Sequence, residues 1–513
     1  MMDVVSNDAP YPEPEFVTPP PLRPPPKPKQ RTSMALGMTI VFLGVLTLFI
    51  AAFLDLVALH DKPWNTTLIL FEVPDRLPDT MLYPVQARRV SRPEPLDSDL
   101  ALALLGKMAG WENFEHELDL DAPELVIALD LPEQELHPLL ASGRLPRPGH
   151  AEVLAGPLAR EASFFIGDLE FEVVGALHDT VSGFIFAYML PHLSDFDALF
   201  TEEHNAVPGI LVVAGETLIE AGVLAEFKRF SIPQDVPAVS EPPLDEDADP
   251  EEGAAEVADE ERPLVLPPYI GGMMPAMRGV VSLAAFGLLL VALGGALFHF
   301  GLFKRLRHAG RIRWLQPALD EIVARPRLFW AMHLLLYGAF FLSMRVAINN
   351  PLLTWRVTQY IEAAFSHGGL SYVGEAYASG NVNKAAWATF HNNYIVQTLG
   401  LTFLISVFPL PVGILKTLFS FTLVGGAMAP MWVGAAQGYV IHSITMALEL
   451  EAYIVACFAI AVWMMYLFRA LASRQFKQPL KDGARLLLSA ALLTAVMLMI
   501  AAYYEAFTLI KLI

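Results

Sequence analysis

The chain has 513 residues, of which 54% are hydrophobic and 17% are charged, whereas soluble domains carry about 25% charged residues. Its mean hydropathy of +0.44 excludes a chain made only of soluble domains. Its net charge of −20 argues against nucleic-acid binding, which needs a basic surface. Of the 54 acidic residues, 46 precede residue 276. This uneven distribution predicts a polytopic α-helical membrane protein with one large water-facing domain.

The N-terminal segment combines a polar tail with an apolar run. Residues 1–33 are rich in proline and favour an extended, solvated tail. Residues 34–59 are long enough to cross a bilayer and end in bulky residues rather than in a signal-peptidase site. Because Lys27, Lys29 and Arg31 precede this run, we expect an uncleaved signal anchor with a cytoplasmic N-terminus.

Residues 60–275 contain 41 acidic residues against 12 Lys and Arg, and we expect them to face outward. Alternating apolar runs predict strands beginning at Thr67, Leu125, Leu169 and Ile210, and residues 100–108 predict a helix after an N-cap at Ser98. Residues 60–240 are therefore predicted to form an extracytoplasmic α+β domain. The dense acidic run in residues 241–265 predicts a disordered linker.

Six further apolar runs bring the predicted number of transmembrane helices to about seven. They cover residues 276–303, 328–348, 394–410, 412–429, 452–469 and 486–508. The loops 304–327 and 469–485 are rich in Lys and Arg, so we place both in the cytoplasm. Residues 328–513 would then form a five-helix bundle, in which 394–429 either spans twice or forms a re-entrant pair.

Two outward-facing stretches of the bundle are too polar to span. Residues 355–365 have helical apolar spacing and are predicted to lie in the membrane interface. Residues 431–451 are predicted to form a separate interfacial or cavity-lining helix. In it, His442 and Glu449 are seven residues apart and share one face.

The sequence contains none of the motifs HExxH, GxSxG, GxGxxG or the phosphate-binding P-loop. With one cysteine, Cys457, the chain has no disulfide framework or Cys-rich zinc site. Residues 115–117 (EHE) and 202–204 (EEH) would suit a metal, but on an acidic surface solvation is favoured. We therefore expect no catalytic residue, no cofactor site and no metal site.

Ionisable groups within apolar runs are more informative, because their burial in a membrane is costly. They are Asp55, His299, His333, Arg345, Glu449, Glu451 and Glu505. We favour His333 and Glu449 for a functional role and expect Glu451→Ala to be the milder substitution. The candidate partner or structural positions are Asn392, Asn393, His442, Glu449, Glu451 and His333.

Residues 310–513 resemble the stage II sporulation protein M family of polytopic membrane proteins. The similarity rests on the pair Asn392–Asn393, the glycine-bearing hydrophobic run from Pro411 to Gly426, and Glu449-Leu-Glu-Ala. This last stretch is similar to the family's His-Gly-x-x-Glu-Leu-x-Ala signature. The resemblance implies a non-enzymatic scaffold for envelope partners, including peptidoglycan hydrolases.

Residues 140–190 resemble the extracytoplasmic domain of MacB-type ABC-transporter permeases. The similarity rests on residues 142–156 and 166–175, with Gly143, Gly149 and Gly167 at predicted turns. It implies a permease subunit, or a mechanotransmission complex, that works with a separate cytoplasmic ATPase. Both resemblances imply a bacterial inner-membrane protein, and the oligomeric state stays open.

Overall fold

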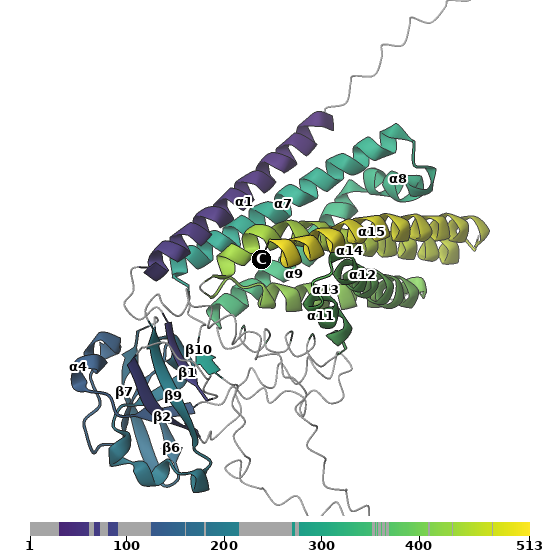
Figure 1. Cartoon of the computed structure of the whole chain (residues 1–513). Coiled ribbons are helices and arrows are strands. Elements are labelled where there is room, and N and C mark those ends of the chain that lie inside the picture. Colours follow the sequence, from purple (N-terminus) through teal and green to yellow (C-terminus); the bar gives the residue numbers. More distant parts are fainter. Residues whose placement is uncertain are drawn as a thin grey trace, which may run out of the picture.

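The computed structural model describes residues 30–60, 66–71, 81–90, 125–159, 161–178, 181–214, 269–271, 276–350, 354, 357, 361, 365, 369–408, 411–432, 434–474 and 476–512. It contains a bundle of long helices and a separate sheet-containing domain (Figure 1). Within these residues, five helices are long and apolar enough to cross a membrane. The chain is thus a multi-pass membrane protein with a separate domain, as the composition predicts.

In the described part of the domain, ten strands form one sheet in the order β10-β1-β9-β2-β3-β8-β5-β7-β4, with β6 paired to β7. The strands are β1 (Thr66–Leu70), β2 (Met81–Arg89), β3 (Leu125–Leu129), β4 (Leu140–Gly143), β5 (Glu152–Ala155), β6 (Ser163–Ile166), β7 (Leu169–Leu177), β8 (Ala187–Leu190), β9 (Val207–Ala214) and β10 (Tyr269–Gly271). A short helix, α4 (Glu133–Leu136), follows β3. All four predicted strands are therefore present.

The middle of the sheet is covered on both faces, which explains the continuous apolar run of β3. Every residue of β3 is buried, and its side chains alternate between two hydrophobic clusters, one containing Ile127 and the other Val126. Gly143, Gly149 and Gly167 have φ of 84°, 71° and 59°. In this left-handed region glycine avoids a Cβ clash. The predicted turns at Gly149 and Gly167 are confirmed, whereas the one at Gly143 is wrong, because Gly143 ends strand β4 and pairs with Gly175 of β7.

Helix α1 (Gln30–His60) packs antiparallel along α7 (Arg278–Ala309), as Figure 1 shows. A Cβ on Gly37 would lie 2.5 Å from the backbone nitrogen of Phe298, and one on Gly294 would lie 2.6 Å from that of Val41. Neither position accepts a side chain without displacing a helix. Close backbone packing of this kind holds helices together in lipid, where apolar burial between helices gains little.

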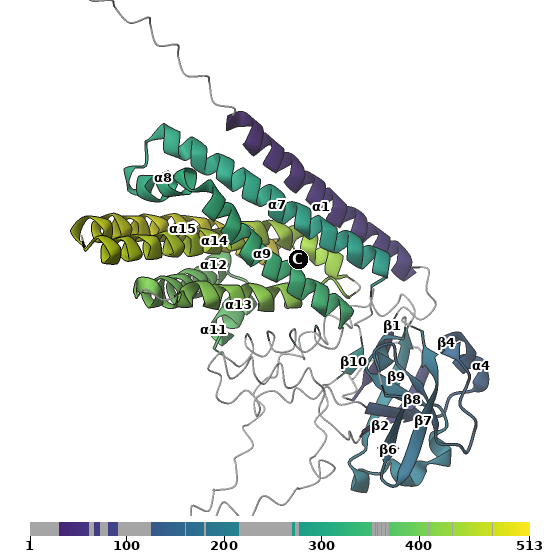
Figure 2. The same ribbon diagram turned by 180° about the vertical axis from the view of Figure 1, so that it is seen from behind.

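The other long helices are α9 (Pro326–Asn349), α14 (Ala435–Ser473) and α15 (Lys477–Lys511), and Figure 2 shows them from behind. The predicted separate helix over 431–451 is wrong. Residues 435–473 form one continuous helix, which includes the predicted span 452–469. No proline or glycine interrupts the chain at this boundary, so nothing local ends the helix there.

The segment predicted as the loop 304–327 contains a helix, α8 (Gln316–Ala324). The apolar residues Ala318, Leu319 and Ile322 are buried in the cluster shared with α15. The backbone N–H of Ala318 donates to the Ser489 hydroxyl (3.0 Å), and the Tyr466 hydroxyl donates to Glu321 (2.6 Å). These contacts bring the two basic segments to the same end of the bundle.

Two shorter elements form a hairpin beside α14. They are η8, a π-helix (His391–Leu404) extended by a 3-10 turn to Val407, and α13 (Val412–Ala427). The Trp463 indole donates to the Val407 carbonyl (3.2 Å) near the tip of the hairpin. Neither element is among the five candidate spans, so the number of seven transmembrane helices is not confirmed.

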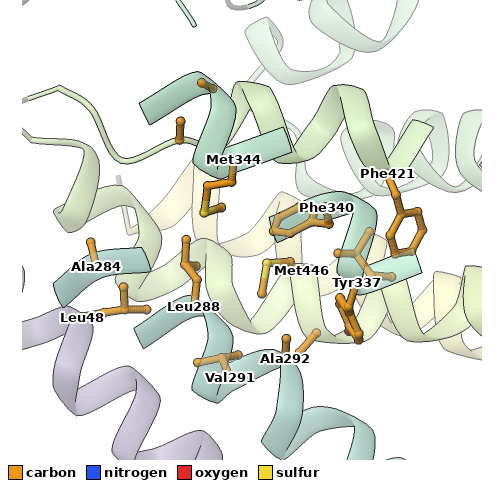
Figure 3. Packing of buried hydrophobic residues seen from close by; sticks show 14 of the residues in the cluster. Leu48, Ala284, Leu288, Val291, Ala292, Tyr337, Phe340, Met344, Phe421 and Met446 are labelled. Carbon is orange, nitrogen blue, oxygen red and sulfur yellow. The ribbon is translucent and has the colours of Figure 1, made fainter. Parts of the chain in front are cut away.

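The core of the bundle joins α1, α7, α9, α13 and α14. Figure 3 shows Leu48 of α1, Leu288 of α7, Phe340 of α9 and Met446 of α14 turned toward one another, and all belong to one buried cluster. Phe421 of α13 lies in the same cluster. These contacts fix the helices on which the polar residues described below are carried.

The sheet domain adjoins the bundle end opposite the basic segments. Strands β1 and β10, which neighbour α1 and α7 in the chain, pair with each other through Leu68–Gly271, Ile69–Ile270 and Leu70–Tyr269. The Phe186 and Trp432 rings lie 6.3 Å apart between domain and bundle, and the Ala276 N–H donates to the Met431 carbonyl (2.7 Å).

Several predicted features lie outside the described residues. They are the tail up to residue 29, the helix over 100–108 with its cap, the segment 115–117, the linker 241–265 and most of the interfacial helix over 355–365.

Candidate functional site

Helix α14 carries Glu449 and Glu451 in opposite directions. Residues two positions apart in an α-helix point in directions that differ by about 200° around the helix axis. Glu451 accordingly meets α9, while Glu449 meets η8 and α15. The two carboxyl groups therefore belong to two separate polar clusters, one on each side of the helix.

The first cluster is fully buried and consists of His333, Tyr337 and Glu451. The exposed fraction of Glu451 is 0% and that of His333 is 4%. The His333 Nε2 lies 3.0 Å from Glu451 Oε2, and the Tyr337 hydroxyl donates to Glu451 Oε1 at 3.1 Å. Residues 333 and 337 are one helical turn apart, so α9 presents both to the same carboxyl group. We call these three residues the His–Glu cluster.

The hydrogen bonds of the His–Glu cluster fix its proton count. The His333 Nδ1 lies 2.8 Å from the Phe329 carbonyl, and a carbonyl only accepts, so Nδ1 carries a hydrogen. The contact between Nε2 and the carboxyl group then holds one further proton, on either partner. The pair is neutral as a whole, which reduces the cost of burying it among apolar helices.

A second histidine approaches from α7. His299 is 5% exposed, and its Nδ1 lies 2.9 Å from the Gly295 carbonyl, so this nitrogen also donates. His299 is close enough to interact electrostatically with Glu451. Three helices, α7, α9 and α14, thus bring polar side chains to one buried region.

The second cluster joins α14 to η8 and α15. The Asn393 amide donates to Glu449 Oε1 at 2.9 Å, and the Asn392 amide donates to Asn393 Oδ1 at 3.0 Å. The Glu505 side chain lies within hydrogen-bonding reach of Glu449. An ionised carboxylate only accepts hydrogen bonds, so this contact requires a proton on one of the two glutamates. We call Glu449 and Glu505 the carboxyl pair.

The π-helical winding of η8 accompanies this cluster. The hydroxyl groups of Thr398 and Thr402 donate to carbonyl groups five residues earlier, those of Asn393 and Gln397. In an α-helix they would bond three or four residues back. Long π-helices are rare, and π-turns are frequent at functional sites. The winding begins at His391, directly before the two asparagines.

The remaining predicted candidates do not join these clusters. His442 is half-buried on α14, two turns before Glu449. Residues 202–204 form a 3-10 turn, in which His204 Nδ1 contacts the Thr201 hydroxyl (2.8 Å). Within the described part of the chain, no three His, Cys, Asp or Glu residues are arranged to hold a metal ion.

The sequence identified most members of the two clusters but not their pairing. His333, Glu451, Asn392, Asn393 and Glu449 were all candidates, and the structure divides them between the two sides of α14. Tyr337 was missed, although its position one turn after His333 was a usable signal. Glu505 was noted only as an ionisable group. Its approach to Glu449 depends on the packing of α15 against α14.

A third charged cluster lies in the sheet domain, outside the helices. Arg144 and Arg147 both donate hydrogen bonds to the buried Glu152 carboxylate on β5. The distance to Glu152 Oε1 is 2.7 Å from Arg144 Nη2 and 3.0 Å from Arg147 Nε. Hydrogen bonds from the two guanidinium groups hold the pKa of Glu152 well below its usual range. These bonds tie the turn around Gly149 to the sheet.

The fold and its buried polar clusters define a helical membrane protein with an attached sheet domain. Comparisons with protein-family models, with curated proteins and with solved structures find no match. The two family resemblances of the sequence therefore stay predictions.

Proposed function

We propose that this protein is a non-enzymatic scaffold of the bacterial inner membrane that organises envelope or peptidoglycan-remodelling partners around its sheet domain. The observation that carries the proposal is the double attachment of that domain. Strands β1 and β10 pair with each other, and the helices that neighbour them, α1 and α7, pack backbone to backbone. A domain attached in this way keeps a defined place above the bundle, as a platform for partners requires.

The proposal includes a topology of seven crossings with a cytoplasmic N-terminus and residues 60–275 outside. Two observations support it. The basic segments 304–327 and 469–485 meet at one end of the bundle, while the sheet domain adjoins the other. The hairpin of η8 and α13 extends from Asn393 beside Glu449 to Val407 beside Trp463, and so runs along α14 from residue 449 to residue 463.

Cysteine labelling tests this topology. Single cysteines replace Arg311, Lys481 or Glu203 in turn. The first two positions show on which side of the membrane the basic segments lie, and position 203 shows the side of the sheet domain. We expect impermeant thiol reagents to label only position 203 in intact cells, and all three after lysis. The native Cys457 is fully buried and gives little background. Labelling of position 311 or 481 in intact cells would refute the topology.

Partner recovery tests the scaffold function. Gly294→Leu inserts a side chain where a Cβ already meets the Val41 backbone. We expect it to separate α1 from α7 and to abolish recovery of outer-face partners, including cell-wall hydrolases, in a pull-down from gentle detergent. The matched control is Gly338→Leu on α9, where a Cβ meets nothing within 4 Å. Equal recovery with both variants would contradict the proposal.

The second candidate function is the permease subunit of a transporter with a separate cytoplasmic ATPase. The polar clusters inside the helices favour it, because ionisable groups in membrane spans often mark transport pathways. The same pull-down distinguishes the two functions. Recovery of an ATPase that contacts the basic end would favour the permease, and recovery of outer-face hydrolases would favour the scaffold.

A further inference from the structure

A hollow of about 400 Å³ opens between two short helices. None of its lining residues belongs to the His–Glu cluster or to the carboxyl pair. The helices are α11 (Ser371–Ala378) and α12 (Val382–Phe390), and the hollow continues to the start of η8. Its polar and aromatic lining consists of Tyr372, Glu375, Lys384, Trp387 and His391. The hollow thus combines an acid, two basic side chains and two aromatic rings.

Helical spacing turns these residues toward the hollow. Lys384, Trp387 and His391 follow one another at intervals of three and four residues, and Tyr372 and Glu375 are three residues apart on α11. The other side of α12 is anchored, because Ala385 and Ala386 are buried against Ala506 of α15. The Tyr372 and His391 rings lie 6.0 Å apart, nearly perpendicular. The hollow is therefore built on helices that are fixed to the bundle.

The polar side chains of the hollow have no hydrogen-bond or ion-pair partner among the described residues. In the part of the chain that the structure describes, the side chains of Glu375, Lys384 and His391 form no ion pair or hydrogen bond. Glu375 and Lys384 line the same hollow without reaching each other. Separated opposite charges of this kind complement a ligand that carries both a cation and an anion.

The position of the hollow indicates where such a ligand comes from. It lies at the end of α15 remote from the basic segments, beside Ala506. The exposed fraction of Trp387 is 60% and that of Tyr372 is 37%. Exposed Trp and Tyr are typical of the headgroup level of a bilayer. A lipid headgroup reaches this level by diffusion within the membrane.

We propose that this hollow binds the phosphoethanolamine headgroup of a membrane phospholipid. Lys384 and His391 face the phosphate, and Glu375 accepts hydrogen bonds from the ammonium group. The rings of Trp387 and Tyr372 add cation–π attraction to the same ammonium group. This site goes beyond the proposed scaffold function, because it assigns a lipid ligand to a surface that no partner protein requires.

Native mass spectrometry of the delipidated full chain tests the site. The protein is mixed with equal amounts of phosphatidylethanolamine and phosphatidylglycerol, which have similar tails and differ in the cationic group. We expect the first lipid to be retained about tenfold more, a difference of about 1.4 kcal/mol. Equal retention of the two lipids would overturn the proposal.

Variants assign the binding to the hollow. We expect the double variant Glu375→Gln, Lys384→Gln to lose the preference, and Trp387→Leu to weaken it. The matched controls, Lys477→Gln and Trp314→Leu, change exposed residues at the opposite end of the bundle and should keep it. Because the Glu375 and Lys384 side chains form no hydrogen bond or ion pair within the described chain, thermal unfolding of the double variant should not change. Wild-type preference in the double variant would overturn the proposal.

A soluble competitor distinguishes a lipid from a free phospho-amine. Glycerophosphoethanolamine carries the same headgroup without the acyl chains. We expect it to displace phosphatidylethanolamine only at concentrations at least about tenfold higher, since it lacks the apolar contacts of the tails. Displacement at equal concentration would contradict the assignment to a lipid.

Discussion

The Asp55 carboxylate at the end of α1 accepts a hydrogen bond of 2.6 Å from the backbone N–H of Gly434, which lies 379 residues later. Gly434 is the N-cap of α14 and has φ of 86°. A carboxylate at this place stabilises a helix whose first N–H groups have no partner within the helix. Asp55 is 2% exposed, so the contact joins the first and the longest helix of the bundle.

Removal of this contact should destabilise the protein. Asp55→Ala leaves the Gly434 N–H without its acceptor, and we expect the free energy of unfolding to fall by about 1–3 kcal/mol. Asp55→Asn keeps an acceptor and should lose less. Reversible unfolding in mixed micelles measures both variants. Asp55→Ala with wild-type stability would mean that the carboxylate does not cap α14.

The His–Glu cluster should be the most sensitive polar site in the bundle. Glu451→Ala or His333→Ala leaves a buried partner unpaired, and we expect each to lower the free energy of unfolding by about 3–5 kcal/mol. The sequence alone favoured Glu449 over Glu451. That preference concerns function. For stability, we expect the larger loss at Glu451, because it is completely buried whereas Glu449 is half-buried.

A double-mutant cycle checks that the two residues act together. The loss in the double variant His333→Ala, Glu451→Ala should be smaller than the sum of the two single losses, because residues in contact are coupled. His308→Ala, an exposed histidine near the end of α7, is the control. Additive losses would refute the coupling.

The carboxyl pair predicts different outcomes for two substitutions of Glu449. Glutamine accepts from Asn393 and donates to Glu505, as a protonated glutamate does. Glu449→Gln should therefore keep most of the stability. Glu449→Ala leaves Asn393 without its acceptor and should cost about 1–3 kcal/mol. An equal loss in both variants, measured in the same micelles, would show that the two glutamates share no proton.

The Glu152 cluster predicts a pH dependence of the sheet domain. Because the folded-state pKa of Glu152 is below the value of about 4.5 for an unperturbed glutamate, its contribution is complete above that pH. The contribution is lost as the pH falls further toward the folded value. Glu152→Gln should therefore have a lower Tm than wild type at pH 7, with a gap that narrows only below about pH 4.5.

The control for this experiment is Glu170→Gln on β7, which changes an exposed glutamate. We expect it to leave the Tm unchanged throughout the same range. A gap between Glu152→Gln and wild type that stays constant down to pH 3 would contradict the role of the two arginines.

The local pattern of the sequence was sufficient for the class of protein and for most of its elements. Apolar runs identified the long helices, since a membrane span must satisfy its backbone internally over about 20 apolar residues. Alternating runs identified β1, β3, β7 and β9, and glycine identified the turns at Gly149 and Gly167. These features depend on residues close together in the chain, so composition and spacing report them directly.

The tertiary structure decided which polar residues meet. Glu449 and Glu451 are two residues apart, yet the packing of α9 on one side of α14 and of η8 and α15 on the other gives them different partners. The contact between Asp55 and Gly434 also depends on segments that are distant in the chain. Hydropathy reports the depth of a residue in the membrane but not the direction in which its helix is turned by its neighbours.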